Sequence, residues 1–225
     1  MPVKKTIKIK RDKILCMFSG DLNSLGALYV LLKDPNFENK QIHVHQARVK
    51  DHKNPGLVEK LACEKILNYF KSNTYREFQV TECQHDISFL NQHQVEKSTY
   101  SGFMAANMVI NDVSISAIAV GLNTEETKNV SIVKKLNKGR SLFQTMLPEE
   151  LRYSTNYIFP VAHLSKLKIW QMLPSELKNL VWVCERPIYK DQRVYSCQQC
   201  GPCVDLDKVK KADAQSAWAH PLGLG

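Results

Sequence analysis

No apolar run in this sequence approaches the roughly 18 residues that a membrane span requires. The basic stretch at residues 1–13 also lacks the apolar segment of a secretory signal. We therefore expect a cytoplasmic protein with no membrane partner. Internal repeats and low-complexity tracts are missing as well, which excludes a repeat array. With 44% hydrophobic and 24% charged residues among 225, the composition is typical of a folded globular protein.

Acidic residues are fewer than basic ones, and the net charge of +9 permits an anionic partner, either a nucleotide or a nucleic acid. A nucleic-acid interface typically interleaves basic and aromatic residues on one face, and no clear motif of this kind is evident. A nucleic-acid partner therefore stays open. Much of the charge lies near the two ends, which is also typical of solvated segments. These residues are Lys4, Lys5, Lys8, Lys10, Arg11, Lys13, Lys208, Lys210 and Lys211.

Short apolar runs alternate with longer amphipathic segments along the chain. The run at 13–18 is almost wholly apolar, as expected for a strand buried on both faces of a sheet. After the Ser-Gly-Asp turn, Asn23 or Ser24 is expected to cap a helix over 25–33. Further strands are predicted at 41–49, 76–82, 115–120 and 157–161, and further helices at 57–71, 99–110, 130–146 and 166–173.

Strands that alternate with helices of this length predict an α/β fold with a doubly wound, mostly parallel sheet. Ligands of such sheets bind beyond the carboxyl ends of the strands, which directs attention to the turns after Phe18, His45 and Val120. We divide the chain into a basic N-terminal strand or tail at 1–12, an α/β domain at 13–180, a metal-binding segment at 181–211 and a C-terminal tail at 212–225.

Four of the seven cysteines are grouped near the end of the chain, separated by twelve, two and two residues. Four thiolates at this spacing can complete a tetrahedral site with Zn–S distances of about 2.3 Å, leaving no open position, so a structural zinc ion is expected. An iron–sulfur cluster and unliganded thiols are the alternatives. Gly201 is expected to allow the tight turn within the group. The four ligands are Cys184, Cys197, Cys200 and Cys203; Cys16, Cys63 and Cys83 are expected in the core.

The segment after the first strand reads Ser-Gly-x-x-x-Ser and leads into a helix. Such a turn places free backbone N–H groups and a positive helix end at one point, which favours an anion. The residues concerned are Ser19, Gly20, Asp21, Leu22, Asn23 and Ser24.

Taken together, the loop and the cysteine group resemble the 7-cyano-7-deazaguanine synthase (QueC) family of the PP-loop ATP pyrophosphatase superfamily. That superfamily's loop reads Ser-Gly-Gly-x-Asp-Ser, and the family ends with a Cys followed by a Cys-Gly-x-Cys-x-x-Cys region. The stretch at 119–123 is similar to the family's Ile-Gly-Val-Asn, and the stretch at 164–169 is similar to its Leu-Thr-Lys-x-Glu-Ile. The resemblance spans residues 13 to 206 in the family's order.

The resemblance implies a PP-loop/HUP-like Rossmann-type fold and an ATP-dependent C–N ligase. The carboxylate of a 7-deazaguanine would be adenylylated, combined with ammonia and dehydrated to a nitrile, as in queuosine-type metabolism. ATP and Mg²⁺ would then be bound by residues 19–24 together with Gly121 and Asn123. No catalytic residue is assigned. Members of the family commonly pair, so a homodimer is a further expectation.

The departures from the family pattern fall on the loop. Asp21 stands where the family has its second glycine, and Asn23 stands where it has an aspartate. Ser98 and Thr99 align with the family's Arg-Asn pair. The alternative is therefore a catalytically inert relative that binds a nucleotide, a nucleic acid or a protein.

Three further features have two interpretations each. His43 and His45 would share one face of a strand and could ligate a metal, although satisfied core or surface histidines are the commoner case. Asn123 is either a substrate contact or a turn residue. The basic residues at 134–140 either meet a phosphate or form a solvated helix face.

Overall fold

The computed structural model describes residues 10–50, 57–73, 75–89, 96–191 and 193–218. Residues 1–9 of the predicted N-terminal segment and residues 219–225 of the predicted tail therefore lie outside the described part. The elements are β1 (Lys13–Met17), α1 (Leu22–Lys33), η1 (Pro35–Phe37), β2 (Gln41–Lys50), α2 (Leu57–Ser72), β3 (Phe78–Asp86), α3 (Lys97–Asn111), β4 (Ile115–Val120), α4 (Thr124–Thr127), α5 (Val130–Met146), α6 (Glu149–Arg152), β5 (Asn156–Ile158), α7 (Lys166–Met172), α8 (Ser175–Lys178), β6 (Ile188–Lys190), β7 (Arg193–Tyr195) and α9 (Gly201–Trp218).

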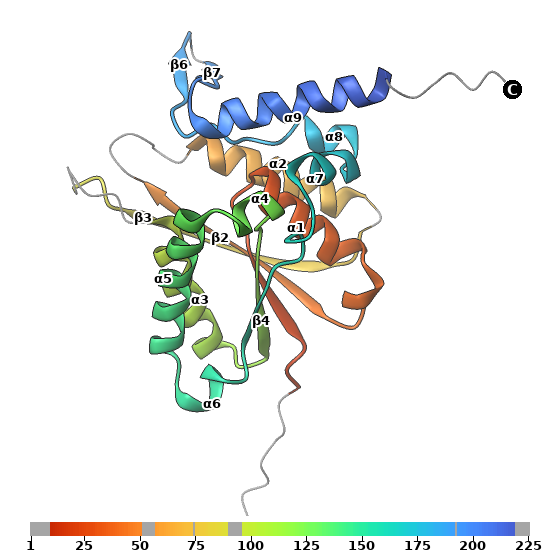
Figure 1. The fold of residues 1–225 in the computed structure, drawn as a ribbon. Helices are drawn as coiled ribbons and strands as arrows, with labels where there is room; N and C mark the ends of the chain where they lie inside the picture. The colour runs from red at the N-terminus through yellow and green to blue at the C-terminus, as the bar shows by residue number, and fades with distance from the viewer. Residues whose placement is uncertain (1–9, 51–56, 74, 90–95, 192, 219–225) are drawn as a thin grey trace, which may run out of the picture.

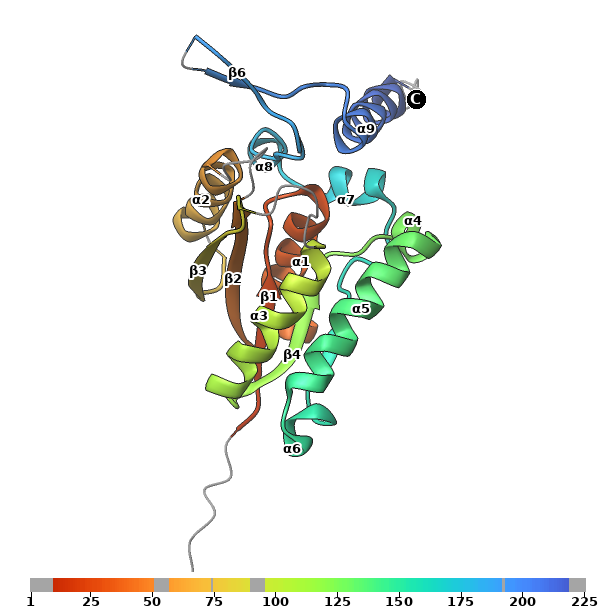
Figure 2. The same ribbon diagram turned by 90° about the vertical axis from the view of Figure 1, so that its left-hand side faces the viewer.

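The main sheet has the strand order β3-β2-β1-β4-β5, and every neighbouring pair in it is parallel. Helices α3 and α5 cover one face, and α1, α2 and α7 cover the other (Figures 1 and 2). The predicted α/β class with a parallel sheet is confirmed. Strands β6 and β7 form a separate antiparallel pair.

Strand β1 is central because both of its faces are apolar. Leu15 packs into the core beneath α3 and α5, whereas its neighbour Cys16 packs into the core beneath α1 and α2, and neither is exposed. Successive strand side chains point to opposite faces, so this short apolar run fills both cores at once. Cys63 is also buried, while Cys83 is only partly buried.

Helix α1 begins at Leu22, three residues before the predicted start, and its cap is Asp21, so the predicted caps Asn23 and Ser24 are wrong. The Asp21 carboxylate accepts a hydrogen bond from the Ser24 N–H at 2.8 Å. A side-chain oxygen at this position satisfies one of the donors that the first turn leaves without a partner.

Several predicted strands differ in their bounds from those observed, among them β3, which spans Phe78–Asp86 where 76–82 is predicted. Strand β2 passes His45 without a turn and continues to Lys50, since β3 pairs with it as far as Asp86. The turn expected after His45 is therefore absent from the structure. Strand β5 is shorter than predicted and starts at Asn156, because its pairing with β4 ends at Ile158.

Helix α9 lies across the end of the domain and contacts α7 (Figure 1). Lys166 pairs with Asp205 at 3.0 Å, and the indole of Trp170 donates a hydrogen bond to Asp213 at 3.0 Å. The helix continues without interruption past residue 211, where the predicted metal-binding segment ends. None of the helices in the described part of the chain has the length and apolar character to cross a membrane.

Helices α3 and α5 cross at two glycines. A methyl group added at Gly102 would lie 2.2 Å from the backbone oxygen of Gly139, and one added at Gly139 would lie 2.3 Å from the backbone oxygen of Ser98. The backbones of α3 and α5 therefore approach so closely that a side chain larger than that of glycine would not fit at either position. This contact fixes the start of α3 against α5.

We predict that Gly102→Ala destabilises the protein by about 1–3 kcal/mol, because the new methyl group forces the two helix backbones apart. Thermal unfolding should show a fall in Tm of roughly 2–4 °C per kcal/mol for a chain of this size. Gly201→Ala is the matched control, since a methyl group there meets nothing within 4 Å. Equal Tm values for the two variants would contradict the close crossing.

Candidate functional site

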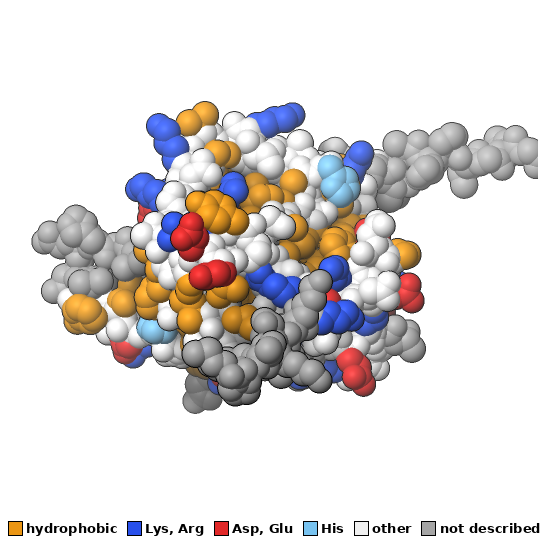
Figure 3. All heavy atoms as spheres, turned by 90° about the horizontal axis from the view of Figure 1, so that it is seen from below, with side chains coloured by type: hydrophobic (Ala, Val, Ile, Leu, Met, Phe, Trp, Pro, Cys, Tyr) orange, Lys and Arg blue, Asp and Glu red, His pale blue; other side chains and the backbone are white. Residues whose placement is uncertain are grey.

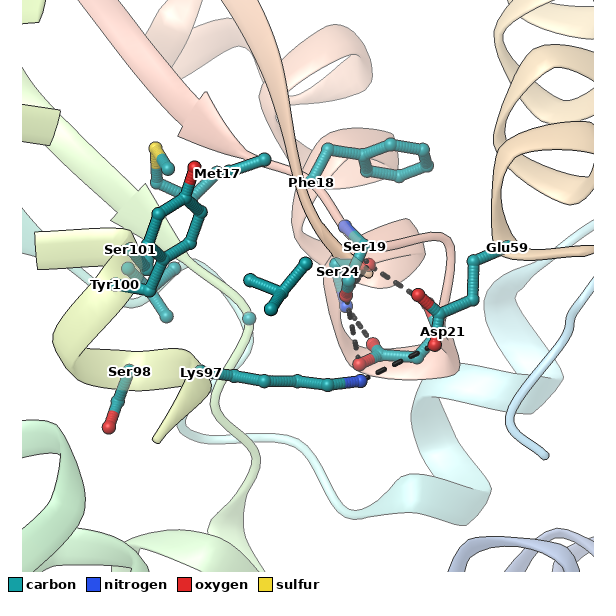
Figure 4. A pocket seen from close by; sticks show the side chains of 14 residues that line it. Met17, Phe18, Ser19, Asp21, Ser24, Glu59, Lys97, Ser98, Tyr100 and Ser101 are labelled. Carbon is teal, nitrogen blue, oxygen red and sulfur yellow. Dashed lines mark hydrogen bonds and ion pairs between the residues drawn. The ribbon is translucent and has the colours of Figure 1, made fainter. Parts of the chain in front are cut away.

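A cavity of about 250 Å³ opens at the carboxyl ends of β1 and β4. The loop at residues 19–24 forms one wall and the start of α3 forms the opposite wall (Figure 4). Its lining combines apolar and polar side chains. The lining residues are Met17, Phe18, Ser19, Asp21, Ser24, Ala47, Val49, Glu59, Lys97, Ser98, Tyr100, Ser101, Val120 and Gly121.

Gly20 gives the loop its shape. Its φ of +78° lies in the left-handed region, and a methyl group there would lie 2.6 Å from the Cys63 sulfur atom. Glycine is the residue that meets both conditions without strain. The loop is therefore seated directly on α2.

The Asp21 side chain occupies the anion-binding point of this loop. Its carboxylate accepts hydrogen bonds from the Ser24 N–H at 2.8 Å and from the Ser19 hydroxyl at 3.0 Å. Figure 4 shows the three side chains gathered at the first turn of α1. The Ser24 N–H and the Ser19 hydroxyl, which could otherwise donate to a phosphate, thus already donate to the Asp21 carboxylate.

Asn23 and Asn123 bond to each other away from the cavity. The Asn123 amide donates to the Asn23 oxygen at 3.0 Å, and the Asn23 amide donates to Glu126 at 2.8 Å. Asn123 also caps α4 by accepting from the Glu126 N–H, and its exposed fraction is 0%. Burial raises the pKa of Glu126. Asn123 is therefore a turn and capping residue here, and the interpretation as a substrate contact is not supported.

Gly121 brings the end of β4 against the loop. A methyl group there would lie 2.5 Å from the backbone of Asn23 and Ser24. Of the residues predicted to bind the nucleotide, Ser19, Asp21, Ser24 and Gly121 line the cavity. The others are buried and do not line it: Gly20, Leu22, Asn23 and Asn123.

Lys97 and Glu59 are cavity residues that the sequence did not single out. Lys97, the first residue of α3, reaches towards the loop, and its ammonium group lies 3.4 Å from the Glu59 carboxylate (Figure 4). Burial opposes its charge, yet the neighbouring Glu59 raises the pKa of Lys97 overall. Its position in the sequence could have indicated Lys97, because this residue immediately precedes Ser98 and Thr99, which align with the family's Arg-Asn pair.

None of the basic residues at 134–140 lines the cavity, and two of them are engaged on helix α5. Lys138 pairs with Glu96 at 3.6 Å, and the Arg140 guanidinium lies over the Tyr157 ring at 5.5 Å. The phosphate interpretation of this segment is therefore not supported.

His43 and His45 do share one face, and both ring systems contact the Thr81 hydroxyl at 2.8 Å. Burial lowers the pKa of His45 to about 4. Among the described residues, the one group of three or more His, Cys, Asp or Glu side chains close enough for a shared metal is the cysteine group. The histidine pair is thus a packed, hydrogen-bonded pair.

The sulfur atoms of Cys184, Cys197, Cys200 and Cys203 all lie within 4.8 Å of one another. Zn–S bonds of about 2.3 Å in a tetrahedron correspond to S···S separations of about 3.8 Å, so a single ion fits with small adjustments. Backbone N–H groups of Cys197 and Cys200 donate to sulfur at 3.2 and 3.3 Å. Hydrogen bonds from the backbone N–H groups of Gln199 and Cys200 lower the pKa of Cys197 to about 6.

The tight turn in the cysteine group is made by a residue other than the one predicted. Gln198 has a φ of 58°, whereas Gly201 is the first residue of α9 and has ordinary backbone angles with open space around it. The turn thus precedes Cys200 and leads directly into the helix.

Comparison with protein families and with curated proteins gives no match. Among solved structures, the chain is similar to the U34-tRNA thiolase NcsA from Methanococcus maripaludis with its 4Fe-4S cluster. The identity is 11% and the TM-score is 0.46, over 93% of this chain and 70% of that chain. Likeness at this level assigns no function.

Proposed function

We propose that this protein is a PP-loop-type, ATP-dependent C–N ligase of the QueC kind, acting on the carboxylate of a 7-deazaguanine. The observation that carries the proposal is the cavity at the carboxyl ends of β1 and β4, bounded by the Ser-Gly loop. Parallel α/β sheets bind their ligands at this edge. The family resemblance of the loop and of the cysteine group supplies the chemistry.

The cavity suits a flat ring better than a whole nucleotide. Ligand pockets for larger molecules measure roughly 300–1,000 Å³, and this one holds about 250 Å³. Met17, Phe18 and Val120 offer an apolar surface for a base, whereas Ser19, Asp21 and Lys97 line the cavity with polar groups. A triphosphate would then extend over the rim, past the loop.

In the proposed reaction, the substrate carboxylate attacks the α-phosphorus of ATP and pyrophosphate leaves. Ammonia then displaces AMP to give an amide. The amide oxygen attacks a second ATP with release of pyrophosphate, and its departure as AMP with loss of two protons gives the nitrile. Lys97 is placed to stabilise the negative charge that develops on the phosphates. Mg²⁺ would reduce that charge further, and the carboxylates of Asp21 and Glu59 line the cavity as oxygen ligands for it.

A second candidate is an inert protein of the same fold that binds a base or a macromolecule. The position of the Asp21 carboxylate favours it, since this group takes the hydrogen bonds of the Ser24 N–H and the Ser19 hydroxyl. ATP could use these donors only after the Asp21 side chain had turned away.

We further propose that the cysteine group holds zinc. A cluster spreads its thiolates over several iron atoms, so they stand farther apart than around one ion, and separations within 4.8 Å favour the single ion. The metal would hold the segment before β6 to the start of α9. Reduced thiols persist in the cytoplasm, which is the location that we propose.

The ligase proposal predicts release of AMP and pyrophosphate when the protein is incubated with ATP, Mg²⁺, ammonium and 7-carboxy-7-deazaguanine. Lys97→Gln should lower the rate by about 10²-fold, because one charge-stabilising donor is lost. Lys71→Gln, at an exposed position outside the cavity, should leave the rate unchanged. Absence of AMP together with absence of ATP binding by calorimetry would support the inert protein instead.

The zinc proposal predicts one zinc ion per chain by elemental analysis and no absorption band near about 400 nm, where iron–sulfur thiolates absorb. Cys200→Ser should weaken zinc binding by more than about 100-fold, a larger loss than removal of a hydrogen-bond partner of a metal ligand causes. It should also destabilise α9, since metal binding is coupled to folding. Cys83→Ser, outside the group, is the control. A brown protein containing iron would contradict the assignment.

A further inference from the structure

The antiparallel pair β6–β7 stands out from the body of the protein, at the same end as α9 (Figures 1 and 2). Its register pairs Ile188 with Tyr195 and Lys190 with Arg193. Residues directly opposite in an antiparallel pair project to the same face. One face of this hairpin therefore carries an aliphatic, an aromatic and two cationic side chains.

This face is open to solvent, as is Tyr189 on the opposite face, whose exposed fraction is 50%. Tyr195 is 47% exposed and Ile188 is 51% exposed. The opposite face carries Val194, which is partly buried, and Tyr189. Partial burial raises the pKa of Tyr189, and the nearby Glu59 carboxylate adds to the effect.

The two cations at the end of the hairpin have no counter-ion in the part of the chain that the structure describes. Within those residues, no ion pair joins Lys190 or Arg193 to a carboxylate. Like charges directly opposite destabilise a strand pair, and short isolated hairpins are marginal to begin with. An external anion would relieve this repulsion.

Two basic residues in the middle of α9 are already engaged. Lys210 lies over the Trp170 ring at 5.6 Å, and Lys211 pairs with Asp207 at 2.7 Å. On the face seen from below, the visible Lys and Arg side chains are scattered among apolar and acidic ones (Figure 3). The hairpin is different because it places two cations without a described ion pair beside an exposed aromatic ring.

We propose that this face of the β6–β7 hairpin binds single-stranded nucleic acid. Lys190 and Arg193 contact successive phosphates, and Tyr195 provides the surface on which a base stacks, with Ile188 beside it. A stacking contact of this kind requires an unpaired base, which favours a single strand over a duplex. The inference does not depend on the proposed ligase reaction.

The test is fluorescence anisotropy of the full chain with a labelled oligothymidylate of about 12 nucleotides, within the usual site size. Tyr195→Ala should weaken binding by at least about fivefold, through loss of stacking. Lys190→Gln combined with Arg193→Gln should make the slope of log K against log salt shallower by about 1.4, because each phosphate contact to a single strand contributes about 0.7.

The matched control is Lys40→Gln combined with Lys71→Gln, which removes the same charge from exposed positions outside the hairpin. It should leave the slope close to that of the native protein. An unbound oligonucleotide, equal slopes in the two double variants, or a duplex bound as tightly as the single strand would each overturn the proposal. Sedimentation that shows self-association lost in Tyr195→Ala would do the same, since the face would then be a protein interface.

Discussion

The first turn of α1 has N–H groups that need an acceptor, and here Asp21 supplies one from the loop itself. The rest of the site is arranged around this contact. It starts the helix at Leu22, turns Asn23 towards Glu126, and places Ser19 and Ser24 along the cavity. The glycines at 20 and 121 let α2 and β4 approach the same loop from two sides. A site of phosphate-binding geometry thus contains a carboxylate of its own.

The effect of the Asp21 carboxylate on ATP binding depends on the energy of the helix cap and on the repulsion between Asp21 and a phosphate. Loss of a side-chain cap costs about 1 kcal/mol, which equals roughly a fivefold change in affinity. Two like charges at about 4 Å repel by about 4 kcal/mol near a protein surface. The repulsion is the greater of these two energies, so a triphosphate binds well only if Asp21 turns away or shares a cation with it. In the proposed nucleotide site, the charge of Asp21 would therefore oppose a triphosphate by more than the helix cap holds the side chain in place.

The sequence predicted those features that depend on local patterns. The apolar runs located β1 and β4, and the cysteine spacing identified four side chains whose sulfur atoms do lie together. The missed features depend on contacts between distant segments. Lys97 forms an ion pair with Glu59 across the cavity, and Asn123 bonds to Asn23, 100 residues away in the sequence. The two cations of the hairpin become neighbours only through the strand register. The sequence pattern misplaces the start of α1, because the residue that caps the helix is Asp21 and not Asn23 or Ser24. Asn23 is a buried residue of the loop that donates a hydrogen bond to Glu126. A change to aspartate there would place a second negative charge beside the Glu126 carboxylate.

Calorimetric titration of ATP with Mg²⁺ into the native protein and into Asp21→Asn tests the role of Asp21 most directly. Asparagine keeps an oxygen that can accept from the Ser24 N–H, so the helix cap remains while the charge is removed. If the charge of Asp21 restrains the site, ATP should bind Asp21→Asn at least about tenfold more tightly than it binds the native protein. Equal or weaker binding by the variant, with the helix content unchanged, would contradict that account.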